Sequence, residues 1–386
     1  MTDRKEPIDG HLPEWMPATA HPVVPPQQMP PQPNRATTDG ASVQIAQQPN
    51  GSSVQITLPD IPRRQLQDPI PPDHAPRYKV EGTQEVIKSP DAGVGGWWRR
   101  TRGLLGKAPE LPPEQQLLRV KKPLGEPRVI VFCNHDGGCT KTTTAAAVGQ
   151  ELATHRRDRI IAIDAADAVG GLSQRLPVQN RSTIRTLLRN INSVRKWTDA
   201  RAHTSQGRTG LELLTSGQSI ADEDILTAAD YRRVIAVLTA HDTYNLILVD
   251  CDAGVTGELM DEVFRSADLL VIPVAGSDGV AGGVAAANRL RYLADKYPDA
   301  ADHFMGLLRN AIVVLSHLNQ HSTVKDDTVR AWFTDQIGVR AVKSIPFDRM
   351  LQDGQSVDIS AIHPKTERQF LALAAEVVTA LAERER

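Results

Sequence analysis

The stretch VIVFCNHDGGCTKTTT, residues 129–144, decides the fold. A short apolar run leads directly into a glycine-containing loop, and the loop leads into a helix-forming segment. This order predicts a phosphate cradle, because loop amides and the helix N-terminus converge on an anion while a lysine reaches its terminal phosphates. The generic pattern is met only in part: Lys141 and Thr142 are present, but Thr140 stands where a glycine is expected.

Short apolar runs alternate with amphipathic stretches from Arg128 to the C-terminus, which is typical of βαβ units on a parallel sheet. The sequence therefore predicts a doubly wound, mostly parallel α/β domain over residues 128–386. The predicted strands are 129–133, 160–164, 211–216, 246–250, 268–274, 311–316 and 339–346. The predicted helices include 142–154, 230–240, 279–294 and 366–383.

The N-terminal part has a different composition, since 22 of the 27 prolines precede Val129. Residues 1–96 contain few large apolar side chains, so they cannot bury enough surface to offset chain entropy, and we predict a disordered proline-rich tail. Residues 97–127 are predicted to be a docking segment and linker, because Trp97 and Trp98 are followed by a cluster of arginines. This segment could contact an acidic protein, a membrane surface or nucleic acid, or fold back on the domain.

Charge, apolar runs and cysteine spacing argue against several other classes of protein. The formal net charge of −2 does not favour nucleic acid or anionic lipid as a partner of the whole chain. The N-terminus has no secretory signal pattern and no apolar run approaches the length of a membrane span, so we expect a cytoplasmic protein. Cys133, Cys139 and Cys251 lack metal-site spacing and are predicted to be buried free thiols.

The segment DGGCTKTT, residues 136–143, resembles the deviant phosphate-binding loop KGGxGKT[ST] of the ParA/MinD family of dimerising P-loop ATPases. The resemblance implies ATP and Mg²⁺ as ligands and a homodimer as the assembly. It assigns phosphate binding to the loop and the start of the following helix, with Lys141 also counted as catalytic. The residues are Gly137, Gly138, Cys139, Thr140, Lys141, Thr142 and Thr143.

Further motifs follow in the order of the same family. Asp164 at the end of the second strand resembles its first catalytic carboxylate, and Asp250 in YNLILVDCDAG resembles the carboxylate that orients magnesium together with the Thr142 hydroxyl. Ser316 stands where the family has a base-reading asparagine. Pro346 and Asp348 in IPFDRMLQDG resemble the late loop beside the base.

Three positions depart from the family pattern: Asp136 replaces a lysine, Thr140 a glycine and Ala166 a second aspartate. The resemblance implies that these changes reduce hydrolysis and nucleotide-driven dimer closure more than nucleotide binding. The function expected is thus an ATP-binding switch with weak or absent hydrolysis. A slow but working ATPase and an adaptor that binds no nucleotide and acts through its tail remain alternatives.

The segments DARAHTSQ (199–206), GLELLTS (210–216) and DYRRVI (230–235) resemble the actinobacterial, long-tailed members associated with type VII secretion. This implies a secretion-related or similar protein partner that binds through residues 1–107. Basic residues between 181 and 208 could form a DNA surface, but solvated helix faces are the favoured interpretation. The stripe along the last helix has core spacing, so packing on the sheet is favoured over membrane binding; its residues are Phe370, Leu373, Ala374, Val377 and Leu381.

Overall fold

The computed structural model describes most of the chain from residue 111 onward. The described ranges are 111–166, 170–216, 226–240, 243–318, 326–352 and 356–384. The predicted tail of residues 1–96 and the tryptophan- and arginine-rich segment 97–107 lie outside the described residues.

The strands form one eight-stranded sheet in the order β3-β4-β2-β5-β1-β6-β7-β8. All adjacent pairs are parallel except the edge pair β3 and β4. The prediction of a doubly wound, mostly parallel α/β domain is therefore confirmed. The strands are β1 Arg128–Phe132, β2 Ile160–Ala165, β3 Ser205–Gln206, β4 Glu212–Leu214, β5 Leu246–Cys251, β6 Leu269–Val274, β7 Ile312–Ser316 and β8 Ala341–Ile345.

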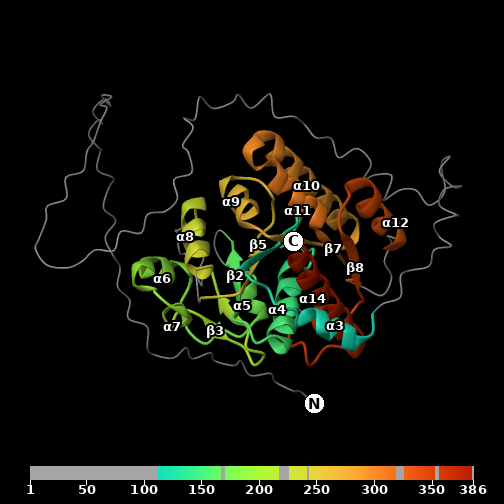
Figure 1. The fold of residues 1–386 in the computed structure, drawn as a ribbon. Coiled ribbons are helices and arrows are strands. Elements are labelled where there is room, and N and C mark those ends of the chain that lie inside the picture. The colour runs from blue at the N-terminus through green and yellow to red at the C-terminus, as the bar shows by residue number, and fades with distance from the viewer. Residues whose placement is uncertain are drawn as a thin grey trace, which may run out of the picture. The chain divides into compact units, whose positions relative to one another are not determined.

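Helices cover both faces of the sheet (Figure 1). One face packs against α3 Pro113–Val120, α4 Lys141–His155, α5 Leu172–Arg175 and α14 Pro364–Arg384. The other packs against α6 Ile184–Arg189, α7 Trp197–Arg201, α8 Ala228–Leu238, α9 Glu258–Ser266, α10 Gly276–Lys296, α11 Ala301–Asn310 and α12 Asp326–Ala331. The shorter elements are η2 Ile191–Ser193, η3 Pro298–Ala300, the π-helical η4 Trp332–Ile337 and α13 Arg349–Gln352.

The central strands read as continuous apolar runs because both of their faces are buried. In β1, Val129 and Val131 face the core under α8–α11, while Ile130 and Phe132 face the core under α4 and α14. The chain leaves β1 toward β2 on one side and later returns to β6 on the other, so the order of the strands reverses at β1. Ligands of such sheets bind at the carboxyl ends of the strands near this reversal.

The folded part begins before the predicted boundary at residue 128. Helix α3 lies within the stretch 97–127 and packs on α14 and α4 through Leu117 and Val120. The backbone just after the C-terminal end of α3 is held by the Arg156 guanidinium, which donates to the carbonyl of Lys122 at 2.7 Å. An eight-residue helix is too short to show a clear period, and its stability comes from packing, which sequence pattern does not reveal.

Other predictions about the core are confirmed. The predicted stripe of the last helix, from Phe370 to Leu381, is buried in α14 against the sheet. Cys133, Cys139 and Cys251 are buried free cysteines. Among the described residues, no helix is both long and apolar enough to cross a membrane.

Candidate functional site

The glycine-containing loop lies at the carboxyl end of β1, where the strand order reverses. Its backbone is anchored by Asn134, which is fully buried. The Asn134 amide nitrogen donates to the carbonyls of Pro273 at 2.7 Å and Gly279 at 2.9 Å, and its oxygen accepts from the Asp136 amide at 2.9 Å. The loop is therefore tied to β6 and α10 as well as to its own strand and helix.

The loop turns into α4 through two residues in left-handed conformation, Gly138 at φ 71° and Thr140 at φ 65°. Gly137 and Gly138 are exposed, whereas Cys139 is buried and its thiol donates to the Gly137 carbonyl at 3.4 Å. Thr143 is buried within the first turn of α4. The N-terminal amides of a helix attract anions, so the exposed glycines and the start of α4 form an anion-binding surface.

Lys141 is the first residue of α4, and its side chain turns back over the loop. The ammonium group donates to the Asp136 carbonyl at 2.7 Å, although the residue as a whole is buried. Burying an ammonium costs free energy unless an opposite charge pairs with it, and a backbone carbonyl supplies no such charge. A terminal phosphate bound in the same loop would be the counter-ion of Lys141.

Asp164 and Asp250 lie opposite each other in the β2–β5 register, at the carboxyl ends of their strands. Both side chains are buried, and Oδ2 of Asp164 and Oδ1 of Asp250 have no hydrogen-bond partner among the described residues. Burial, with a smaller contribution from Asp252, raises the pKa of Asp164 to about 7. Burial and then the charge of Asp164 raise the pKa of Asp250 well above its ordinary value, while the Thr142 hydroxyl bonded to it acts in the opposite direction.

Two orphaned carboxylate oxygens beside a hydroxyl are a donor set that a divalent cation fits. Mg²⁺ prefers oxygen ligands and keeps several waters, so it can be held by few protein groups. Thr142 is half-buried at the first turn of α4, next to Asp250. The predicted magnesium residues, Thr142 and Asp250, are thus brought together, and a cation here would offset the cost of burying the carboxylates.

A pair of glycines that the sequence predictions missed closes over these groups. A Cβ on Gly170 would lie 2.1 Å from Cγ of Asp164, and one on Gly171 would lie 2.8 Å from Oγ1 of Thr142. The segment continues into α5, where the Leu172 amide donates to Asp164 at 3.1 Å. Only glycine permits this close approach. The signal in the sequence was the Gly-Gly pair soon after the second strand.

The residues predicted to lie beside the base have different environments. Ser316 ends β7, and its hydroxyl accepts from the Thr140 hydroxyl at 2.8 Å, which joins it to the phosphate loop. Asp348 is buried, and its carboxylate accepts from the amides of Met350 at 3.0 Å and His363 at 2.8 Å. Asp348 therefore joins the backbone near Met350 to the backbone at His363. Pro346 is the first residue after β8.

The departures from the family pattern are visible in the geometry. The Asp136 side chain lies against α10, since a Cβ on Gly282 would be 2.4 Å from its Oδ2. It thus adds a negative charge beside the loop. Ala166 follows β2 and is buried, so no carboxylate is present two residues after Asp164.

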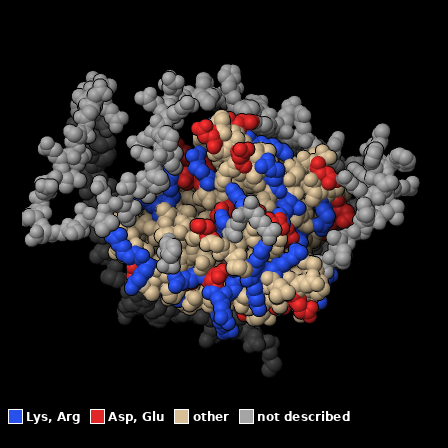
Figure 2. Space-filling view, in the orientation of Figure 1, with Lys and Arg blue, Asp and Glu red and all other residues tan. Residues whose placement is uncertain are grey.

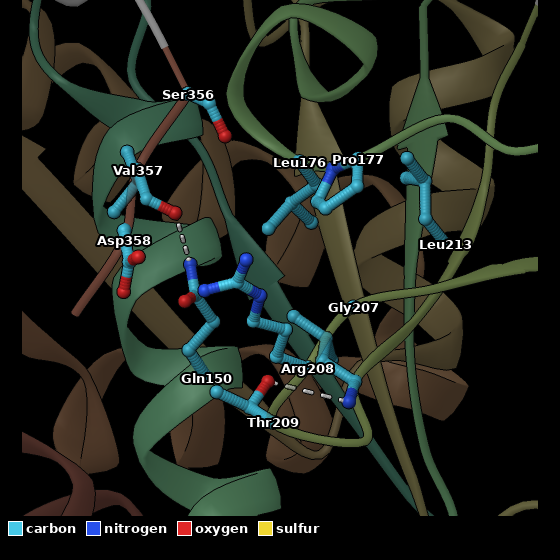
Figure 3. A pocket seen from close by; sticks show the side chains of 11 residues that line it. Gln150, Leu176, Pro177, Gly207, Arg208, Thr209, Leu213, Ser356, Val357 and Asp358 are labelled. Carbon is cyan, nitrogen blue, oxygen red and sulfur yellow. Dashed lines mark hydrogen bonds between the residues drawn. The ribbon is translucent and has the colours of Figure 1, made fainter. Parts of the chain in front are cut away.

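A hollow with a cavity volume of about 120 Å³ lies away from the phosphate loop (Figure 3). Gln150 of α4 contributes to it, but the Gln150 amide already donates to the Val357 carbonyl at 2.7 Å. The cavity contains none of the predicted site residues. Its lining is Gln150, Leu176, Pro177, Gly207, Arg208, Thr209, Leu211, Leu213, Ser356, Val357 and Asp358.

Two of the basic residues between 181 and 208 lie beside carboxylates. Arg185 pairs with Asp230 at 3.0 Å, and Arg201 lies 3.6 Å from the buried Glu212. Figure 2 shows Lys and Arg interspersed with Asp and Glu on the face that it draws. These contacts favour the interpretation of solvated, ion-paired helix faces.

Comparisons with known proteins agree with this geometry. Residues 127–294 match the model of a family described as AAA domain. The chain is 31% identical over 279 residues to the ESX-1 secretion-associated protein EspI of Mycobacterium tuberculosis, a match that covers 71% of this chain and 40% of the relative. The chain thus spans about two fifths of the length of this curated relative.

The solved structures that the fold resembles are related at low sequence identity. A ParA family ATPase from Chlorobium tepidum superposes with a TM-score of 0.51 at 18% identity, over 64% of this chain and 98% of that one. The cell division ATPase MinD of Pyrococcus furiosus superposes with a TM-score of 0.50 at 18% identity, over 65% and 98%. Residues 127–294 thus match the AAA domain family model, and the described domain has the fold of these ParA and MinD ATPases.

Proposed function

We propose that the chain is an ATP-binding switch protein of the ParA/MinD type that serves a secretion apparatus and hydrolyses ATP weakly or not at all. One observation carries the proposal: the phosphate loop and Lys141 lie beside two buried carboxylates, Asp164 and Asp250, each with an orphaned oxygen. These groups suit an anionic phosphate chain and a divalent cation, whereas Ala166 adds no carboxylate for positioning water.

Each residue of the cradle has a defined task in this proposal. The amides of Gly137 and Gly138 and the N-terminus of α4 bind the phosphates. Lys141 exchanges the Asp136 carbonyl for the terminal phosphates, and Thr142 with Asp250 holds the cation. Bound Mg²⁺ neutralises the charge on the phosphate oxygens.

Asp136 opposes closure of two copies around nucleotide. In the ParA/MinD pattern a lysine at this position faces the phosphates across the dimer. At about 5 Å and an effective dielectric constant of about 20, one such charge pair contributes about 3 kcal/mol, so a carboxylate replaces attraction with comparable repulsion. We therefore expect nucleotide binding to survive better than nucleotide-driven dimerisation.

The similarity to EspI supports a role in secretion of the type VII class, since the curated relative is described as ESX-1 secretion-associated. We propose that residues 1–107 bind the protein partner and that the chain acts in the cytoplasm, where ATP is supplied. The matched part covers about two fifths of the relative, so the partner is to be identified directly with this chain.

Calorimetric titration of the full chain with ATP and Mg²⁺ tests the proposal. We expect saturable binding at millimolar ATP or below, loss of that binding in Lys141→Ala, and phosphate release near background. Absence of binding would support the adaptor that acts through its tail. Robust phosphate release would support the slow ATPase.

Restoration of the family residues tests why hydrolysis is weak. The combination Asp136→Lys, Thr140→Gly and Ala166→Asp should raise phosphate release and ATP-dependent dimerisation together, with single changes doing less because these residues act as a unit. Light scattering with and without ATP measures the dimer. A triple variant that stays inert would show that other features of the site suppress turnover.

A further inference from the structure

Thr140 adopts a backbone conformation that is unusual for its residue type. Its φ of 65° and ψ of 19° lie in the left-handed region, and no other non-glycine residue in the described part of the chain has a positive φ. Threonine is β-branched, so its side chain crowds the backbone in this conformation. The strain occurs at the residue directly before Lys141, where the loop enters α4.

A fixed hydroxyl compensates for this strain. The Thr140 hydroxyl donates to Oγ of Ser316 at 2.8 Å, a contact between residues 176 positions apart in the chain. Ser316 is buried, and its backbone is held in register with Ile345 of β8 at the end of β7. The Thr140 carbonyl also accepts from the Thr144 amide at 2.8 Å, which starts the helical hydrogen bonding of α4.

We propose that Ser316 is a positioning residue for the phosphate loop: its hydroxyl latches Thr140 in the left-handed conformation and so sets the direction of the amides that lead into Lys141. The effect on nucleotide binding rests on the proposed function, whereas the latch itself does not. Without the bond, Thr140 relaxes toward the right-handed region and turns the adjacent peptide groups away from the cradle. A glycine at position 140 needs no latch, because it adopts this conformation without steric cost.

This role differs from direct recognition of a base by Ser316. A latch acts through the loop, so its loss weakens binding of any phosphate chain, including inorganic tripolyphosphate, which has no base. A contact with the base affects ATP alone. The two roles also respond differently to glycine at position 140, which makes the latch dispensable and leaves a base contact unchanged.

The experiment is a double-mutant cycle in the full chain with Ser316→Ala, Thr140→Gly and the double variant. Binding of Mg²⁺-ATP and of Mg²⁺-tripolyphosphate is titrated, and the thermal midpoint is measured without any ligand. We expect Ser316→Ala to weaken both ligands about tenfold with Thr140 present, equivalent to about 1.4 kcal/mol, and less than about twofold with Gly at position 140. Without ligand, Ser316→Ala should lower the thermal midpoint only in the Thr140 background.

Three further variants separate the latch from general damage to the fold. Thr140→Ser keeps the hydroxyl and should remain sensitive to Ser316→Ala, whereas Thr140→Val keeps the branched shape without the donor and should be impaired at least as much as Ser316→Ala. Thr379→Ala removes a hydroxyl that donates within its own helix α14, to the Ala375 carbonyl, and should leave both affinities unchanged.

The proposal is overturned if Ser316→Ala has the same effect in both backgrounds, or if it weakens ATP but not tripolyphosphate. If the wild type binds neither ligand, the proposed function fails. The thermal midpoints without ligand then show by themselves whether Ser316 holds Thr140 in the left-handed conformation. Additive midpoint changes would then refute it, and non-additive changes would support it.

Discussion

Glu151 of α4 gives the sharpest test of the electrostatics of this fold. Its side chain is 3% exposed, and Oε1 has no hydrogen-bond partner among the described residues. Oε2 lies 3.2 Å from Nε2 of His155. Burial, and secondarily the charge of Glu367 on α14, raises the pKa of Glu151 to about 8, while burial and then Lys121 lower the pKa of His155. Near pH 7 the contact is therefore a hydrogen bond between neutral groups rather than an ion pair.

The sign of the pH dependence follows from proton binding. Between pH 4.5 and about 8 the folded chain keeps the Glu151 proton and the unfolded chain loses it, so the free energy of unfolding falls as pH rises. The rise of the Glu151 pKa from 4.5 to about 8 corresponds, at about 1.4 kcal/mol per pH unit, to an upper bound near 5 kcal/mol. Local rearrangement and water entry relieve part of this penalty, so we expect a loss of about 2–3 kcal/mol.

Glu151→Gln removes the titration and retains the shape and a donor for His155. Urea unfolding of the full chain, followed by circular dichroism at pH 5, 6.5 and 8.5, measures the effect. The variant should match the wild type at pH 5 and exceed it by about 2–3 kcal/mol at pH 8.5. Titrating groups that do not interact with Glu151 are common to both proteins, and their contributions cancel in the difference. Parallel pH profiles for the two proteins would refute the assignment.

Three further outcomes are expected. Gly282→Ala should lower the free energy of unfolding by about 1–3 kcal/mol, because the added Cβ would lie 2.1 Å from Oδ1 of the anchored Asn134. Gly306→Ala, in open space on α11, should be neutral or stabilising and serves as the control. Urea unfolding measures both variants. Glu212→Ala should cost about 3–5 kcal/mol in the same assay, since it orphans the buried hydroxyls of Thr204 and Tyr244 and the partly buried indole of Trp197. In differential scanning fluorimetry, Mg²⁺-ATP should raise the thermal midpoint of the wild type but not of Lys141→Ala, and equal shifts would count against the cradle.

The order of strands and helices was readable from the sequence because buried parallel strands are apolar runs of a characteristic length. Each predicted strand is present, with ends that move by a few residues. The edge strand β3 was missed, since two residues carry no periodic signal, and so was α3, whose stability depends on α14 and α4. The hydrophobic pattern of a segment predicts buried strands and long helices well, but it predicts short elements that depend on packing poorly.

The candidate site was likewise predictable from the sequence only in part. The sequence by itself determined that Asp164 and Asp250 fall at strand ends and that Lys141 starts the helix after the first strand, and parallel topology brings such ends together. The depth at which the carboxylates are buried and the bond between Thr140 and Ser316 were decided only by the tertiary structure. The reason is physical: a motif fixes residue order and backbone direction, but desolvation and hydrogen bonding depend on which distant segments pack against it.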